Sequence, residues 1–460
     1  MLNLITNKYH INVFINTLLL FIIVFVLEYD VLFQNIYTVF LVQLIVFVYS
    51  YMRIRGVFFL RELFIPSNFT LIYIFFLLIS GAYFLPRYEA LYGMSAKYAS
   101  ITSLRLSSSF FLFTNLVLFF TIPFEKISQI DFKTSIRVRL KDRHLLLASL
   151  IFLVSIFFEI NLSYFGGNEG LFNFPFILMA FIILSINISG FRSFKKIGIY
   201  LFCIILFISK FYGSKREIFF VLITIGIIES SKTIKPFKLN LKKCIIIFLA
   251  LSCILLIVLI SSILRGYGGF GDINIFEALF YVDDYLQNPK IISYLLNNLE
   301  ISYGYFHTMN VFELIETSKI SYTYGETLIK PLFIAFPREV FKFKPDSMVS
   351  IYTTAFDPSF RKAGGSFPVN FVSEVFLNLW YFGLVFLLFL FKYLNRVYMF
   401  VLNGLIENRV SLKLLIGIFT TATIIQFVRG AGIELWLIYM IFGSLFAILY
   451  QLITKNITRL

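Results

Sequence analysis

Residues 244–264 read CIIIFLALSCILLIVLISSIL and are followed by Arg265-Gly-Tyr-Gly-Gly. The first stretch is long and apolar enough to cross a bilayer as a helix, which takes about 20 residues. From residue 265 to about residue 372 the chain is more polar and holds several Asn and most of the Pro. The sequence therefore predicts an all-α polytopic membrane protein with one large loop outside the membrane.

Similar apolar segments recur along the whole chain of 460 residues, of which 59% are hydrophobic and only 14% charged. A water-soluble domain has about a quarter of its residues charged, so this composition excludes a soluble enzyme and a disordered chain. We expect about twelve transmembrane helices, at 11–27, 32–51, 68–85, 107–123, 145–160, 171–190, 197–210, 217–230, 244–264, 373–391, 412–428 and 433–453. The first run lacks a small-residue cleavage site, so we expect a retained span rather than a signal peptide.

The distribution of the 40 Lys and Arg residues predicts the orientation. With both termini in the cytoplasm, 24 of them fall on cytoplasmic segments, seven on short outside loops and nine in the large loop. Cytoplasmic loops carry the excess of positive charge, while long loops are exempt from this rule. We expect spans one to nine in 1–264, a large outside loop over 265–372, and spans ten to twelve in 373–460, with an interfacial cytoplasmic helix near 392–411. The net charge of +15 is then a topology signal and not a nucleic-acid surface.

Signatures of metal and cofactor chemistry are missing from the sequence. The three cysteines, Cys203, Cys244 and Cys253, lie in apolar runs and show no metal-ligand spacing. No P-loop, dinucleotide-binding glycine motif or H-E-x-x-H occurs. We therefore expect no cofactor and no metal.

The large loop contains a basic segment over 321–345, in which Pro337-Arg338 and Lys344-Pro345 form a stiff, positive edge. Arginine matches phosphate oxygens with a fork of donors, and lysine adds a point charge. Phosphate binding and lipid-headgroup binding are both consistent with it. Further arginines stand at span ends on the same face and are candidates to converge on a diphosphate, although each alone is typical of an anchor: Arg216, Arg265 and Arg429.

Two side chains are candidates for proton transfer. Glu374 lies four residues before Asn378, so both share a face at the outer end of the tenth span. A carboxylate that enters a membrane helix is costly and usually functional, unless it lies at headgroup level. His307, in the large loop, is either a general base or a structural residue.

These features resemble the bacterial oligosaccharide repeat-unit polymerases, the Wzy-type O-antigen polymerase family. The resemblance lies in Tyr324-Gly325 with Phe336-Pro337-Arg338 and Lys344-Pro345, in Gly365-Ser366 with Glu374, Asn378 and Gly383, and in Gly213 with Arg216. It implies a GT-C-like membrane glycosyltransferase of the bacterial inner membrane. Such an enzyme transfers a growing glycan from undecaprenyl diphosphate onto another lipid-linked repeat unit at the periplasmic face. A chain-length regulator (polysaccharide co-polymerase) and a flippase are the expected partners.

In this interpretation a set of cations binds the diphosphate leaving group and stabilises its growing charge: Arg216, Arg265, Arg338 and Lys344. Tyr324, Asn378 and Arg429 contact or position the sugar, and Glu374 or His307 accepts the proton of the acceptor hydroxyl. Two alternatives stay open: an O-antigen ligase, and a lipid-linked oligosaccharide flippase, which is not an enzyme. A flippase is expected to have short loops and charged residues in its spans, which this chain does not.

Overall fold

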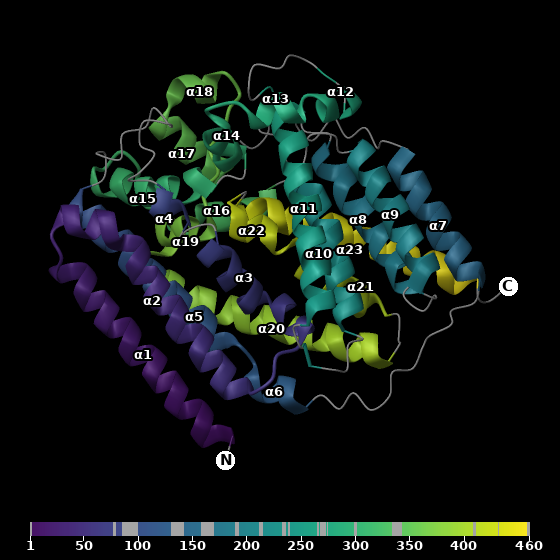
Figure 1. Ribbon diagram of the computed structural model, residues 1–460, viewed down its shortest axis with the longest axis horizontal. Coiled ribbons are helices and arrows are strands. Elements are labelled where there is room, and N and C mark those ends of the chain that lie inside the picture. Colours follow the sequence, from purple (N-terminus) through teal and green to yellow (C-terminus); the bar gives the residue numbers. More distant parts are fainter. Residues whose placement is uncertain are drawn as a thin grey trace.

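The computed structural model of the chain is all-helical, and its described residues contain no strand (Figure 1). The structure describes residues 2–76, 80–84, 100–129, 142–157, 170–188, 193–210, 215–231, 236–237, 240–264, 266, 273, 275–298, 301–333, 343–407, 411–430 and 432–457.

Three long helices lie side by side at the N-terminal side of the molecule: α1 (Leu2–Val26), α2 (Tyr29–Arg55) and α5 (Ile101–Thr121) (Figure 1). A buried amide joins them. Gln43 Nε2 donates to the Leu112 carbonyl at 2.9 Å and to Thr17 Oγ1 at 3.3 Å, while Asn115 Nδ2 donates to Gln43 Oε1 at 2.9 Å. Because water is absent from a bilayer core, hydrogen bonds of this kind between helices fix which faces pack together.

A second buried amide joins this bundle to the C-terminal part of the chain. Asn395, on α20 (Phe382–Glu407), donates from Nδ2 to Ser67 Oγ and to the Thr121 carbonyl, both at 2.8 Å. Ser67 belongs to α3 (Pro66–Ile74). Short elements complete this side of the molecule: η1 (Leu60–Phe64), α4 (Ser80–Phe84) and α6 (Phe124–Gln129).

The other side of the molecule contains a second group of helices, in which α8 packs against both α7 and α23 (Figure 1). These helices are α7 (Asp142–Phe157), α8 (Gly170–Ile188), α9 (Ser193–Lys210), α10 (Lys215–Ser230), α11 (Leu241–Leu264), α21 (Leu412–Thr423), α22 (Ile425–Arg429) and α23 (Gly432–Ile457).

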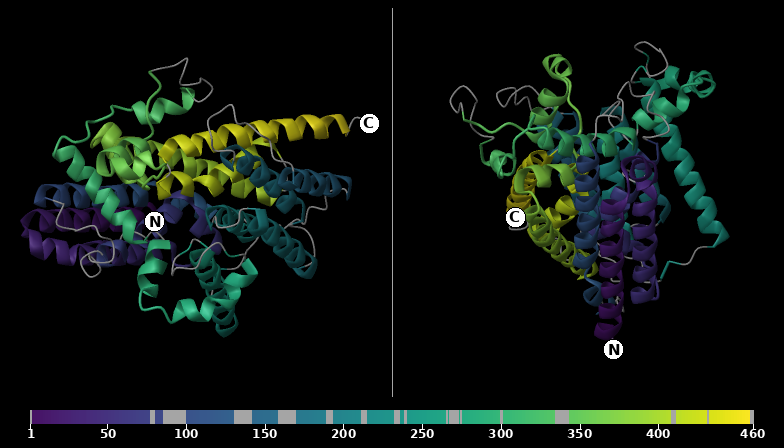
Figure 2. Two further views of the ribbon diagram at one scale, coloured as in Figure 1. Left: turned by 90° about the horizontal axis from the view of Figure 1, so that it is seen from above. Right: turned by 90° about the vertical axis from the view of Figure 1, so that its left-hand side faces the viewer.

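The large loop folds into short helices that gather at one end of the bundle (Figures 1 and 2). They are α12 (Ile275–Phe280), α13 (Val282–Leu286), α14 (Ile291–Asn298), α15 (Ile301–Glu316), α16 (Glu326–Ile329), η6 (Lys330–Phe333), α17 (Met348–Phe356) and α18 (Pro358–Lys362). Two hydrogen bonds join α15 to the start of α5. The Ser100 backbone N–H donates to Glu313 Oε2 at 2.8 Å, and Ser100 Oγ donates to Glu316 Oε2 at 2.7 Å.

The described residues of the twelve apolar segments lie mostly on helices. Six helices in the described part of the chain are long and apolar enough to cross a membrane: Asn7–Val26, Tyr29–Arg55, Ile101–Ile127, Phe382–Leu405, Leu412–Arg429 and Gly432–Ile453. The chain therefore has the character of a multi-pass membrane protein.

The tenth expected span, 373–391, differs from the observed helices. The chain forms a short helix, α19 (Phe371–Leu379), turns at Trp380 with a φ of +50°, and continues as α20. The stretch 392–411 was expected to form a separate interfacial helix, but residues 392–407 continue α20 without a break. The turn brings the start of α20 close to α19, so a Cβ added at Gly383 would lie 2.3 Å from Val375 Cγ1. Glycine at this position lets α20 fold back against α19.

Candidate functional site

Glu374 lies in α19, which is not one of the six helices long enough to cross a membrane, and it is only 1% exposed. Its carboxylate accepts from the Ile433 backbone N–H at 2.9 Å and from Thr327 Oγ1 at 3.3 Å. Ile433 is in the first turn of α23, whose free N–H groups and dipole favour a negative charge. The site therefore combines a buried carboxyl with the positive end of a long helix.

Two opposing effects act on this carboxyl. Burial raises the pKa of Glu374 to about 7, and neighbouring Glu434 acts in the same direction, whereas the two hydrogen bonds lower the pKa. Burial wins because it disfavours the charged form. A pKa near neutrality lets Glu374 exchange a proton at physiological pH, which is what a general base requires.

Asn378 lies one turn further along α19 and orients the hydrogen bonds around Glu374. Its Nδ2 donates to Thr327 Oγ1 at 2.7 Å and to the Glu374 carbonyl at 2.7 Å, while its Oδ1 accepts from Thr323 Oγ1 at 2.9 Å. Because the Thr327 hydroxyl accepts from Asn378, its own proton points to the Glu374 carboxylate. The predicted pairing of Glu374 with Asn378 on one helix face is therefore present in the structure.

The segment Thr323–Phe333 is attached to this site along its length. In addition to the two threonines, the Thr323 backbone N–H donates to the Leu377 carbonyl at 3.2 Å, and Lys330 pairs with Glu434 at 2.8 Å. Glu434 follows Ile433 in the first turn of α23. This segment forms part of the basic segment 321–345, so the network holds that part against α19 and α23.

The turn between α22 and α23 closes the site from the other side. Gly430 has a φ of +121°, and a Cβ there would come within 2.8 Å of the Val369 carbonyl. The Val369 N–H in turn donates to the Gly430 carbonyl at 3.2 Å. Gly432 has a φ of +86°. A Cβ added there would point toward the Glu374 carboxylate and lie 3.6 Å from Oε1. Arg429 immediately precedes this turn and is half-buried, so it belongs to the same locality as Glu374.

Two exposed aromatic side chains lie beside the network on strained turns. Tyr324 is 86% exposed with a φ of +47°, and Trp380 is 49% exposed with a φ of +50°. The Tyr324 ring lies 6.4 Å from Tyr322, and the Trp380 ring lies 5.0 Å from Tyr381. Non-glycine residues rarely adopt positive φ, and such strain is concentrated at functional sites.

His307 lies in a different environment from the one expected of a solvent-accessible base. It is fully buried among aromatic side chains, with Phe367 at 4.7 Å between ring centroids, and its Nδ1 lies 2.6 Å from the Tyr352 hydroxyl. The Tyr352 hydroxyl donates to Asn310 Oδ1 at 3.1 Å. Burial lowers the pKa of His307 to about 3, so the imidazole is neutral at physiological pH. These contacts favour a role in holding α15 against α17.

The structure describes only some of the cations predicted to bind a diphosphate. Arg265 and Arg338 lie outside the described residues, and so does the side chain of Arg216, the second residue of α10. Lys344 is half-buried in the stretch just before α17. Within the described part of the chain, no group of three or more His, Cys, Asp or Glu side chains could hold a metal ion.

The sequence alone did not single out Thr323, Thr327, Lys330 or Trp380. The two threonines carry no local signal, because their partners lie about 50 residues away on α19. Trp380 had one signal: it is one of two tryptophans and lies in the Leu-Trp-Tyr-Phe-Gly stretch at the membrane re-entry.

A shared fold alone is a weak guide to activity, because function depends on the residues of the site. Comparisons of this chain with protein-family models, curated proteins and solved structures found no match.

Proposed function

We propose that this protein is a membrane glycosyltransferase of the GT-C-like kind that polymerises undecaprenyl-diphosphate-linked oligosaccharide repeat units into O-antigen or a similar surface polysaccharide. The observation that carries the proposal is the Glu374 network: a buried carboxyl with a pKa near neutrality, next to exposed aromatic rings at the loop end of the bundle. Glu374 and Asn378 themselves belong to the residue pattern that resembles the repeat-unit polymerases.

The proposed reaction needs a base and a stabilised leaving group. A hydroxyl of the acceptor sugar attacks the anomeric carbon of the donor, a new C–O bond forms, and the bond from that carbon to the diphosphate oxygen breaks. The hydroxyl proton passes to Glu374 and then to water, and undecaprenyl diphosphate leaves with the bonding electrons. No nucleotide sugar and no metal take part in this scheme.

The residues have separate roles in this scheme. Asn378 and Thr327 are positioning residues, because their hydrogen bonds hold the Glu374 carboxylate in one orientation. The basic residues of the loop, with Arg338 and Lys344 foremost, stabilise the charge that develops on the diphosphate as it leaves. Arg216, Arg265 and Arg429 are the further cations proposed to face it.

The exposed aromatic rings are proposed to bind the sugars. A pyranose ring presents an apolar face that can pack on an aromatic ring, and Tyr324 and Trp380 offer such rings outside the protein core. Glu374 itself is covered by Thr327, so acceptor binding must displace the 323–333 segment from α19 before a proton can be transferred. Catalytic hydrogen bonds often rearrange in this manner when substrate binds.

The test is the glycan banding of a bacterium that lacks this gene and is complemented with variants. We expect the deletion to leave single repeat units, the wild type to restore long chains, and Glu374→Gln and Arg338→Ala to fail. Glutamine has nearly the same shape and can still accept from the Ile433 N–H, so it removes the base while keeping the packing. Glu326→Gln, an exposed carboxyl next to Thr327 that the Glu374 network does not use, is the control and should restore long chains.

Other outcomes would identify another protein class. Long chains that stay on the lipid carrier in the deletion strain would indicate a ligase. Repeat units that stay on the cytoplasmic leaflet would indicate a flippase. Full activity of Glu374→Gln, with the variant present in the membrane, would remove Glu374 from the mechanism.

A further inference from the structure

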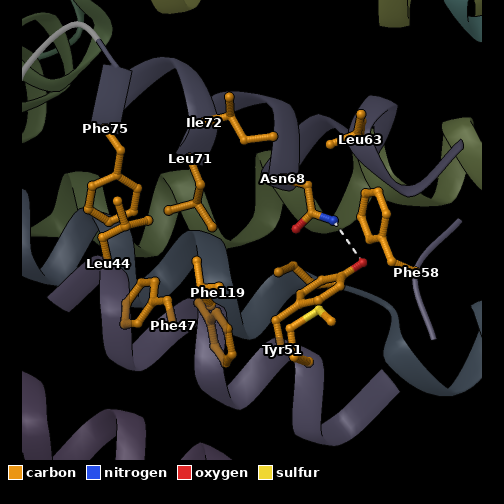
Figure 3. Close-up of a pocket in the computed structure, with 13 residues that line it drawn as sticks. Leu44, Phe47, Tyr51, Phe58, Leu63, Asn68, Leu71, Ile72, Phe75 and Phe119 are labelled. Atoms are coloured by element: carbon orange, nitrogen blue, oxygen red, sulfur yellow. Dashed lines mark hydrogen bonds between the residues drawn. The ribbon is translucent and has the colours of Figure 1, made fainter. Parts of the chain in front are cut away.

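An apolar pocket opens between α2 and α3, far along the chain from the residues of the Glu374 site. Its volume is about 200 Å³, and Figure 3 shows its walls, with Leu44, Phe47 and Tyr51 on α2 facing Leu71 and Phe75. Of its 13 lining residues, only Tyr51 and Asn68 carry a side-chain oxygen or nitrogen. For scale, an engineered apolar cavity of about 150 Å³ in another protein binds benzene. The pocket therefore suits a hydrocarbon and not a polar molecule.

The two polar side chains in the pocket are satisfied by the protein itself. Asn68 Nδ2 donates to the Tyr51 hydroxyl at 3.2 Å (Figure 3). It also donates to the Glu62 carbonyl at 2.9 Å, and Tyr51 donates to Glu62 Oε2 at 2.6 Å. Because these groups already have partners, they do not call for a water or a polar ligand.

The rim of the pocket faces the surroundings of the helix bundle. Val48, Met52 and Ile72 line the pocket and are exposed, whereas Phe47 and Phe119 form its buried floor. Val48 and Met52 lie on α2, one of the six helices long and apolar enough to cross a membrane. An exposed apolar side chain in a span contacts lipid, so the pocket opens sideways into the hydrocarbon of the bilayer.

One end of the pocket lies at a positively charged segment. Tyr51 and Met52 are followed by Arg53 and Arg55, and Arg55 is ion-paired with Glu62. The segment 51–64 contains three arginines and one glutamate, so its formal net charge is +2. Arg61 is only 2% exposed, and Arg53 is the exposed arginine that can reach a headgroup. Basic residues at the end of a span attract anionic lipid headgroups, and the topology predicts that this end is cytoplasmic.

We propose that the pocket between α2 and α3 binds one acyl chain of an anionic phospholipid from the leaflet at the arginine end of α2, with the headgroup beside the 51–64 segment. The lipid is a bound component of the protein and not a substrate of the Glu374 site. Its binding is independent of whether the polymerase proposal holds.

The test is native mass spectrometry of the full-length protein released from detergent, titrated with palmitoyl-oleoyl phosphatidylglycerol. Val48→Trp fills the pocket from its exposed rim, and Ile72→Trp fills it from the opposite wall. Ile45→Trp is the matched control, because Ile45 is similarly exposed on α2 (58% against 53% for Val48) but does not line the pocket.

We expect one phosphatidylglycerol to bind the wild type and Ile45→Trp equally, and each pocket variant to bind it at least tenfold more weakly. Palmitoyl-oleoyl phosphatidylcholine should bind the wild type at least tenfold more weakly than phosphatidylglycerol. Equal loss in all three tryptophan variants, or no loss in either pocket variant, would overturn the acyl-chain site. Equal affinity for the two lipids would overturn the assignment of an anionic headgroup.

Discussion

Replacing Gly430 by alanine tests whether the turn between α22 and α23 holds the candidate site together. The backbone of Gly430 has a φ of +121°, and an added Cβ would come within 2.8 Å of both the carbonyl carbon and the oxygen of Val369. Val369 immediately precedes Asn370, whose side chain caps α19 by accepting from the Val372 and Ser373 N–H groups. The substitution therefore pushes the start of α19 away from the start of α23.

Two costs add at this position. Holding a non-glycine residue at such a φ costs about 1–3 kcal/mol, and forcing an extra methyl into a packed region costs about 1–3 kcal/mol more. Gly364 provides the matched control, because its φ is +86° but an added Cβ would meet nothing within 4 Å. Gly364→Ala carries only the first cost. Alanine also restricts the unfolded chain, and that effect of about 0.4–1 kcal/mol cancels between the two variants.

The free energy of unfolding can be compared in mixed micelles by raising the mole fraction of dodecyl sulfate and following helical circular dichroism. We expect Gly430→Ala to be about 1–3 kcal/mol less stable than Gly364→Ala. We also expect Gly430→Ala to lose glycan polymerisation, because the Ile433 N–H moves away from the Glu374 carboxylate, while Gly364→Ala keeps it.

Equal stability of the two alanine variants would refute the reasoning, since it would mean that the contact with Val369 relaxes at no cost. A stable Gly430→Ala protein with full activity would also separate the turn from the function of Glu374.

Three further predictions concern other parts of the molecule. Gln43→Leu removes the hydrogen bonds that join α1, α2 and α5 and should lower the free energy of unfolding by about 1–2 kcal/mol in the same micelle assay, while Gln34→Leu, at an exposed position of α2, should change it little. Raising the pH from about 4.5 to about 7 should destabilise the wild type by about 3 kcal/mol relative to Glu374→Gln, because the unfolded carboxyl is ionised over most of this range while the buried one ionises only as the pH approaches 7. Wild-type polymerisation should rise as the buried carboxyl ionises, and parallel pH curves for the stability of the two proteins would contradict the buried carboxyl. Tyr324→Ala should leave the unfolding midpoint unchanged and raise the KM for the oligosaccharide acceptor about threefold to tenfold, and an unchanged KM would remove Tyr324 from sugar binding.

The helical class was predictable because it depends on local properties of the chain. A segment such as 244–264 has too few polar side chains to face water, and a helix satisfies every backbone group within the segment. The expected segments therefore lie on helices, as α11 illustrates. The break after α19 was not predictable, because the apolar pattern continues across Trp380 and only its positive φ and the close approach of Gly383 to Val375 end the helix there.

The candidate site was predictable only in part. Glu374 and Asn378 are four residues apart on one helix, so their shared face follows from helical geometry alone. The interfacial helix near 392–411 was wrong as a separate element, because basic residues such as Lys392 and Arg396 are compatible with the end of a long span as well as with an amphipathic surface helix. The burial of His307 also could not be read from its place in a polar loop, since Phe356 and Phe367 surround it only after the loop folds.

Hydropathy and the helical period, which act between residues close along the chain, are enough to predict a helical, apolar chain with one large polar loop and an acidic residue where the chain returns to the helices. The contact of Glu374 with Thr327 and the start of α23, the link that Asn395 makes between α20 and α3, and the pocket between α2 and α3 depend instead on how the helices pack. Such contacts join residues tens to hundreds of positions apart, and they depend on which helix faces pack together, which a single helix does not specify.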